Sequence, residues 1–176
     1  MDKVSLWAPR SHGIIQRADC FDEIIRALTL AATKDRNPSE HISNPIDFVD
    51  DPKQFNTNLI NGRLSHFNTA ETLTDELCFF DRGMPDVIAY MDFFKQNYDD
   101  FFTDACRNHI YDLVFLLPPW KAIYKVDNER FESYEEAVQI HEHLVQVYKT
   151  FGYTIIEVPF GTITERCNFI LNSISK

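Results

Sequence analysis

An acidic and a basic residue stand together where a short apolar run ends. Phe79 and Phe80 are followed directly by Asp81, Arg82 and Gly83. Ligands of open α/β sheets bind beyond the carboxyl ends of the strands, so side chains in this position are candidates for chemistry. Asp81 could bind Mg²⁺ through water or accept a proton from a substrate hydroxyl, and Arg82 could hold a phosphate or carboxylate through its planar guanidinium. The alternative is that Asp81 caps the next helix and Arg82 pairs with a surface acid.

A second candidate is the charged connection of residues 120–130, which precedes a capped helix. Lys121, Lys125 and Arg130 could reach the anionic oxygens of a ligand, because long loops beside a site often close over it. The alternative is a solvated helix-turn-helix whose charges form salt bridges.

Three weaker groups complete the candidates. Glu23 and Arg26 are one helical turn apart, so they either pair with each other or face the same cleft. His141 and His143 are two residues apart and would face apart on a helix, unlike the H-E-x-x-H spacing of zinc helices; we expect surface histidines. The four cysteines are far apart in the sequence and contain no C-x-x-C pair, which predicts reduced thiols rather than a metal site.

The elements that must position these residues alternate along the chain. Nearly continuous apolar runs that stop at Pro or Gly are typical of strands covered on both faces. Helix starts are indicated by the capping patterns of Ser133 with Glu136 and Thr162 with Glu165, and helix ends by residues such as Gly152. The helix that opens at 134 has apolar residues at helical spacing, namely Ala137, Ile140, Leu144, Val147 and Tyr148. The predicted strands are 77–80, 111–117 and 153–158, and residues 4–7 and 19–21 could form two more. The predicted helices are 23–32 and those opening at 51–52, 85, near 101, 134 and 162. This order predicts one α/β domain over residues 1–176, a three-layer parallel sheet flanked by helices.

The composition and the net charge of the chain limit the classes of partner and substrate to be expected. The chain has 176 residues, 44% of them apolar and 14% aromatic, which predicts a packed globular fold. Its formal net charge is -10 and it has no basic stripe, which argues against nucleic acid and anionic membranes as partners. A small anionic substrate remains possible, because a few basic residues in a cleft suffice to bind one. No signal peptide and no apolar run of 18 residues is found, so we expect a cytoplasmic protein; its protein partners cannot be inferred.

The segment 79–90 reads FFDRGMPDVIAY and resembles the FFDRG-x-PD-x-x-AY signature of a small, mainly bacterial family of P-loop proteins. The family is described as AAA-type or NTP-binding ATPases, and its architecture is similar to that of nucleoside and nucleotide kinases. Further similar segments follow in order, including a lid-like one, and together they cover roughly residues 20–171; they are 21–26, 51–63, 114–124, 127–137, 152–159 and 165–171.

The resemblance implies a P-loop, nucleotide-kinase-like fold with ATP and Mg²⁺ as cofactors. It implies that Asp81 lies in the metal shell or acts as base, and that Arg82 and Arg130 stabilise the transferring phosphate. Glu23, Arg26 and Lys121 would line the substrate side. The first function hypothesis is therefore an NTPase or small-molecule phosphotransferase.

The phosphate-binding loop of that family is missing from this sequence. A Walker A loop, G-x-x-x-x-G-K-[ST], is expected after the first strand, but residues 1–20 contain a single glycine, Gly13, and no Lys lies between Lys3 and Lys34. The chain is thus either a relative that lost nucleotide binding, or one whose first residues replace a native loop through a shifted start or frame, or one in which Arg10 and Arg17 substitute for the loop. We expect weak or no ATP binding. The second hypothesis is accordingly a non-catalytic relative that acts as a protein-interaction module.

The two hypotheses differ in one geometric expectation. In the enzyme, Asp81, Arg82 and Arg130 should converge on one cleft.

Overall fold

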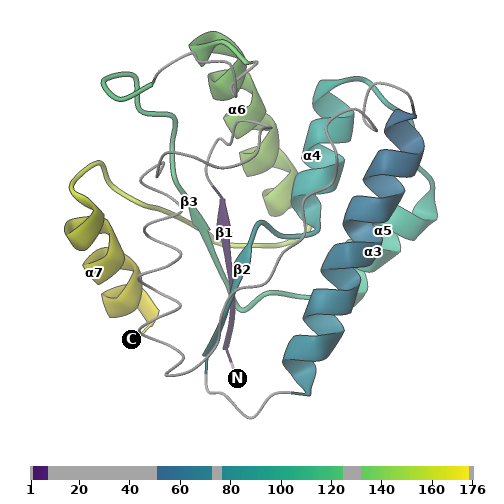
Figure 1. Cartoon of the computed structure of the whole chain (residues 1–176), viewed down its shortest axis with the longest axis horizontal. Coiled ribbons are helices and arrows are strands. Elements are labelled where there is room, and N and C mark those ends of the chain that lie inside the picture. Colours follow the sequence, from purple (N-terminus) through teal and green to yellow (C-terminus); the bar gives the residue numbers. More distant parts are fainter. Residues whose placement is uncertain (1, 8–50, 73–76, 125–131, 175–176) are drawn as a thin grey trace.

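In the computed structural model, residues 2–7, 51–72, 77–124 and 132–174 are described. They form helices around a four-stranded sheet in which every neighbouring pair of strands is parallel, with the order β2-β1-β3-β4 (Figure 1). The strands are β1 (Asp2–Trp7), β2 (Leu77–Asp81), β3 (Leu113–Leu116) and β4 (Ile155–Glu157). The helices are α3 (Pro52–Glu71), α4 (Pro85–Phe93), α5 (Asp100–Asn108), α6 (Tyr134–Thr150) and α7 (Ile163–Ile174). The strands predicted at 77–80, 111–117 and 153–158 are present, and the possible strand at 4–7 is β1. The helix predicted at 23–32 and the possible strand at 19–21 lie outside the described residues.

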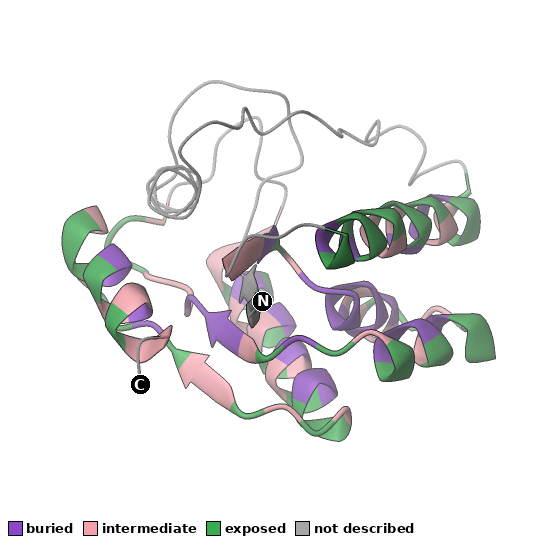
Figure 2. Ribbon diagram, turned by 90° about the horizontal axis from the view of Figure 1, so that it is seen from below, coloured by how far each residue is buried: buried purple, intermediate pink, exposed green. Residues whose placement is uncertain are grey.

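Alternate residues of β2, β3 and β4 enter two separate cores, as the period of a β-strand requires. On one face of the sheet, Phe80, Val114 and Leu116 pack with the buried faces of α3, α4, α5 and α6. On the other face, Phe115 and Leu117 pack with residues of α7. Figure 2 shows α7 on the opposite side of the sheet from the other described helices. The three-layer α/β fold is therefore confirmed.

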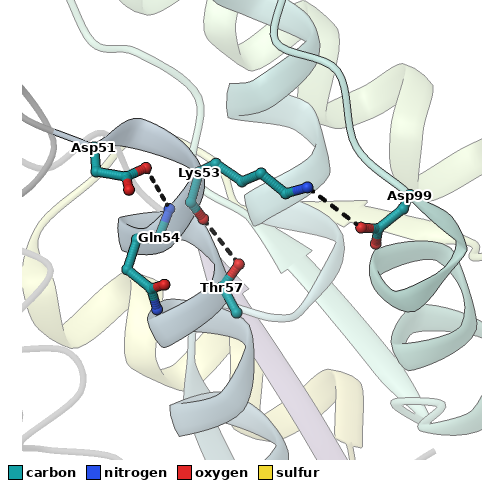
Figure 3. A network of polar contacts seen from close by, with 5 residues as sticks. All are labelled: Asp51, Lys53, Gln54, Thr57 and Asp99. Atoms are coloured by element: carbon teal, nitrogen blue, oxygen red, sulfur yellow. Dashed lines mark hydrogen bonds and ion pairs between the residues drawn. The ribbon is translucent and has the colours of Figure 1, made fainter.

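Helix α3 begins with an ordinary N-cap. The Asp51 carboxylate accepts a hydrogen bond from Gln54 N at 2.9 Å, and the Lys53 Nζ lies 3.6 Å from Asp99 Oδ2 at the start of α5 (Figure 3). The cap satisfies one of the free N–H groups of the first turn. The ion pair is exposed and contributes little to stability.

Helices α6 and α7 begin with the predicted capping boxes. In α6, Glu136 N donates to Ser133 Oγ at 3.1 Å and Ser133 N donates to Glu136 Oε2 at 2.8 Å. In α7, Thr162 and Glu165 form the equivalent pair of bonds. After α6, Gly152 has φ +84°, a left-handed conformation that glycine adopts without strain. The face predicted for α6 is buried, namely Ala137, Ile140, Leu144, Val147 and Tyr148.

The register of the sheet brings the carboxyl ends of all four strands to one edge. Leu6 pairs with Asp81, Trp7 with Leu116, and Leu116 in turn with Glu157. Helices α4 and α7 follow directly on β2 and β4, so their N-termini lie at this edge, which is the upper one in Figure 1. Among the described helices, none has the length and apolar character to cross a membrane.

Candidate functional site

The turn after β2 contains the first pair of candidate residues. Asp81 ends the strand and is exposed, and Arg82 follows with φ +69°. Helix α4 has Met84 as its N-cap, with no side-chain capping bond, so the alternative in which Asp81 caps this helix is wrong. The backbone just before α4 is instead bound by Asp86 of the first turn, whose Oδ2 accepts a hydrogen bond from Gly83 N at 2.7 Å.

The Arg82 guanidinium is held inside the protein rather than in solvent. Its Cζ lies 5.7 Å from the centre of the Tyr90 ring, a cation–π contact. Burial alone would lower the pKa of Arg82, but Tyr90 and the acids Asp81, Asp86 and Glu132 raise it above its ordinary value, so the side chain stays charged. Within the described part of the chain, the buried Nε and Nη2 have no hydrogen-bond partner. A buried donor without a partner is costly, and here it belongs to a charged group.

Asp86 is the buried acid behind this turn, with 1% of its surface exposed. Its Oδ2 accepts a second hydrogen bond, from the Tyr148 hydroxyl of α6 at 2.6 Å, while its Oδ1 is buried without a partner in the described structure. Burial raises the pKa of the Asp86 carboxyl, and Arg63, the Tyr148 hydroxyl and Arg82 act in the opposite direction. Arg63 of α3 also donates from Nη1 to Gly83 O at 2.5 Å. Side chains of α3 and α4 therefore bind the backbone of Gly83, and α6 reaches it through Asp86.

The start of α4 is also bound from β3. Met84 N donates to the hydroxyl of Tyr111, which precedes β3, at 3.2 Å, and Tyr111 is buried against the rings of Phe67 and Phe80. Burial raises the pKa of Tyr111, so its hydroxyl is neutral and can both donate and accept. The turn from Asp81 to Met84 is thus fixed by contacts on several sides.

The loop after β3 carries Lys121, the other described candidate. Lys121 is exposed, and its Nζ lies 5.4 Å from the centre of the Tyr134 ring at the start of α6. Next to it, the Trp120 ring stacks on Phe160 of the loop after β4, with centroids 5.0 Å apart and planes inclined by 21°. These contacts join the loops that follow β3 and β4 to the start of α6. Lys121 belongs to the predicted edge of the sheet, but no contact between it and Arg82 is present in the described structure.

Three of the predicted site residues, Glu23, Arg26 and Arg130, lie outside the described residues, as does Lys125. Convergence of Arg130 on Asp81 and Arg82 therefore stays a prediction. Glu132, two residues further on, contributes to the raised pKa of Arg82. The described end of the lid-like segment is accordingly close enough to Arg82 to act on its charge.

Asp81 is the metal-binding candidate that the sequence proposed, and it lies in the described part of the chain. No group of three or more His, Cys, Asp or Glu side chains in the described ranges is placed to hold a metal ion. Mg²⁺ that accompanies a nucleotide usually takes one or two carboxylates together with phosphate oxygens and water, so an exposed Asp81 fits that mode.

His141 is half-buried, contrary to the surface position we expected. Burial lowers its pKa, and the acids Glu157 and Glu142 act in the opposite direction. His143 Nδ1 lies 2.9 Å from Gln139 O and its ring packs edge-on against Phe93.

Sequence reasoning missed Arg63, Asp86 and Tyr148 as site residues. Asp86 is part of the signature segment, but Tyr148 is predicted only as an apolar residue of α6, and Arg63 only as a residue of a similar segment. The contact between Asp86 and Tyr148 joins residues 62 positions apart, and no local pattern predicts such a contact.

Comparison with known proteins places the chain in a family. The family model described as "AAA domain" matches residues 12–166, which is most of the chain. The chain belongs to this family. The family is one of P-loop NTPases, as the signature segment predicts.

Solved structures with the same fold include deoxyadenosine kinase from M. mycoides. One structure of that enzyme, with the products dCMP and a flexible dCDP, superposes with a TM-score of 0.67 at 13% identity and covers 98% of both chains. Another, with bound dATP, has a TM-score of 0.63 at 14% identity and covers 99% of this chain and 100% of the enzyme. No curated protein matches the chain. The nucleotide-kinase-like fold is confirmed, and at this identity the likeness concerns the fold alone.

Proposed function

We propose that this chain binds a phosphate-bearing small molecule, a nucleotide in the first instance, at the carboxyl edge of its sheet, and that Arg82 contacts a phosphoryl group there. The observation that carries the proposal is the state of Arg82: it is charged and held over Tyr90, and its buried Nε and Nη2 lack partners within the described residues. A planar guanidinium with two adjacent free donors matches two oxygens of a phosphate. The ligand would supply the acceptors that the protein leaves out.

The residues around Arg82 suit phosphoryl transfer. In such reactions catalysis consists mainly of positioning the reactants and stabilising the charge on the transferring group. Arg82 would stabilise that charge together with Arg130. Asp81, exposed beside it, would hold Mg²⁺ through water or accept a proton from the acceptor hydroxyl. Lys121, Glu23 and Arg26 would bind the substrate, and ATP would be the phosphoryl donor.

The missing Walker A loop sets the expected affinity. That loop binds phosphates through backbone N–H groups, and each hydrogen bond to a charged group is worth about 1.5–3 kcal/mol. Losing two of them would cost about 3–6 kcal/mol, a factor of roughly 10²–10⁴ in Kd. We therefore propose weak binding that depends on side chains, in a chain related to phosphotransferases.

Calorimetric titration of Mg-ATP and Mg-dATP into the full chain tests the proposal. Arg82→Ala should abolish the binding. The matched control is Arg107→Ala, which removes the same charge from α5, where Arg107 is exposed and pairs with Asp104 at 3.7 Å. Binding that both variants weaken equally would indicate an effect of net charge and refute the assignment to Arg82.

A second titration separates the two function hypotheses. If the folded wild-type chain binds none of Mg-ATP, Mg-dATP and inorganic tripolyphosphate, the result favours the second hypothesis, a non-catalytic relative that acts as an interaction module. If it binds them, transfer of labelled phosphate from ATP to a panel of nucleosides and nucleoside monophosphates is the next measurement.

A further inference from the structure

The backbone at Arg82 has a conformation that needs support from its surroundings. Its φ of +69° brings the side chain close to the following carbonyl, which is unfavourable for a residue other than glycine. Such conformations persist where the surrounding structure fixes them, and they concentrate at functional sites. The other described non-glycine residue with positive φ is Lys95, which is exposed in the loop after α4. Arg82, by contrast, lies at the candidate site.

The support comes from side chains that bind both backbone polar groups of the next residue, Gly83. Gly83 N donates to Asp86 Oδ2 at 2.7 Å, and Gly83 O accepts from Arg63 Nη1 at 2.5 Å. The residue after Arg82 is therefore fixed from α4 on one side and from α3 on the other. Rotation of the turn would break both bonds.

Asp86 is itself oriented by α6. Tyr148, whose side chain is fully buried, donates its hydroxyl to the same Oδ2 at 2.6 Å. Since Oδ1 has no partner in the described structure, the carboxylate is held through one oxygen, and Tyr148 supplies one of the two bonds to it. Removing this hydroxyl leaves the carboxylate free to rotate about its bond to Gly83.

We propose that Arg63, Asp86 and Tyr148 are positioning residues that hold the Arg82–Gly83 turn, so that the Arg82 guanidinium is presented to a phosphate at the carboxyl edge. The inference rests on the proposed function for the identity of the ligand. The competing explanation is that Asp86 only caps α4, because an acidic residue of the first turn commonly accepts a backbone bond there. Capping requires neither Tyr148 nor Arg63, and it predicts that loss of the Tyr148 hydroxyl changes stability but not phosphate binding.

Tyr148→Phe removes one hydroxyl and nothing else, and Tyr153→Phe is the matched control. The two rings are 5.3 Å apart in one aromatic cluster, but the Tyr153 hydroxyl accepts its hydrogen bond from Tyr111 N at 3.3 Å. Binding of Mg-tripolyphosphate is measured by calorimetry and the melting temperature by circular dichroism. Tyr148→Phe should weaken binding about fivefold or more, and Tyr153→Phe by less than about twofold, whatever the two melting temperatures are. If the wild-type chain binds tripolyphosphate and Tyr148→Phe binds it equally well, the inference is wrong.

A second readout does not depend on ligand binding. In protein labelled with ¹⁵N-arginine, the Nε–H signal of Arg82, assigned with Arg82→Lys, reports the environment and solvent exchange of the guanidinium. Tyr148→Phe and Asp86→Asn should both shift this signal and speed its exchange, while Tyr153→Phe should leave it in place. If the wild-type chain binds no phosphate but the signal responds in this way, the proposed function fails and the positioning network stands. A signal that neither variant changes would overturn the network.

Discussion

Replacing Arg82 by glycine and by alanine should separate what the backbone costs at this position from what the side chain does. Both variants remove the guanidinium and its contact with Tyr90, so the difference between them isolates the conformation at φ +69°. A left-handed conformation costs a non-glycine residue about 1–2 kcal/mol, and glycine adopts it freely. Against this, glycine loses about 0.4–1 kcal/mol more through the entropy of the unfolded chain. Arg82→Gly should therefore be more stable than Arg82→Ala by about 1 kcal/mol.

The assay is urea unfolding followed by far-UV circular dichroism, with the slope fixed by the wild-type transition. For a chain of this length, 1 kcal/mol corresponds to about 2–4 °C in melting temperature, which thermal scans resolve. Phosphate binding serves as an internal comparison, because both variants should lose it to the same extent. If Arg82→Ala is more stable than Arg82→Gly, the backbone at position 82 is not left-handed in solution. There would then be no strained backbone at Arg82 for Arg63, Asp86 and Tyr148 to hold.

Three further predictions concern stability and reactivity. Gly62→Ala should stabilise the protein by about 0.5–1 kcal/mol, because Gly62 lies inside α3 with open space around it. Gly152→Ala should destabilise it by about 1–2 kcal/mol, because Gly152 has φ +84°. Unfolding curves of the two variants that move in the same direction would contradict this. Burial lowers the pKa of His141, so as the pH falls below about 6.5 the unfolded chain takes up the proton first and the stability of the folded chain declines. His141→Gln should reduce this decline in the free energy of unfolding. An unchanged pH profile of stability would exclude the effect. Burial raises the pKa of Cys106 to about 12, so its thiol should resist alkylation at about pH 8 in the native protein and react in urea, as mass spectrometry of the labelled peptides would show.

The elements that follow local rules were predictable from the sequence. Ser133 with Glu136 at the start of α6 and Gly152 after its end bound this helix through interactions within a few residues. The place of β1 in the sheet is a different matter. β1 lies between β2 and β3, and its partner Leu77 is 75 positions from Asp2. A short apolar run indicates a strand, but its neighbours depend on tertiary packing that a local pattern does not contain.

Only the charged residues that follow β2 could be predicted as part of the candidate site. Asp81 and Arg82 could be found because they directly follow an apolar run and because ligands of open α/β sheets bind beyond the carboxyl ends of the strands. Tyr148 could not, since a buried tyrosine has an apolar ring that fits the core pattern of α6 and a hydroxyl whose partner depends on the fold. The same holds for Arg63, which contacts the Gly83 carbonyl from another helix.

The departures from ordinary packing in this part of the molecule concentrate in one turn. Within five residues, Arg82 has a strained φ and buried donors without partners in the described structure, and Asp86 has a buried oxygen in the same condition. Stability does not explain these features, because each is unfavourable by itself. Glycine at position 82 would have neither the backbone strain nor the buried donors without partners. A phosphate at the carboxyl edge would give the Arg82 donors their partners, and the network from Arg63 and Tyr148 would then be the reason that the guanidinium is ready to receive it. In a P-loop fold without a Walker A loop, phosphate affinity would in this way depend on side chains from three helices rather than on the amides of one loop.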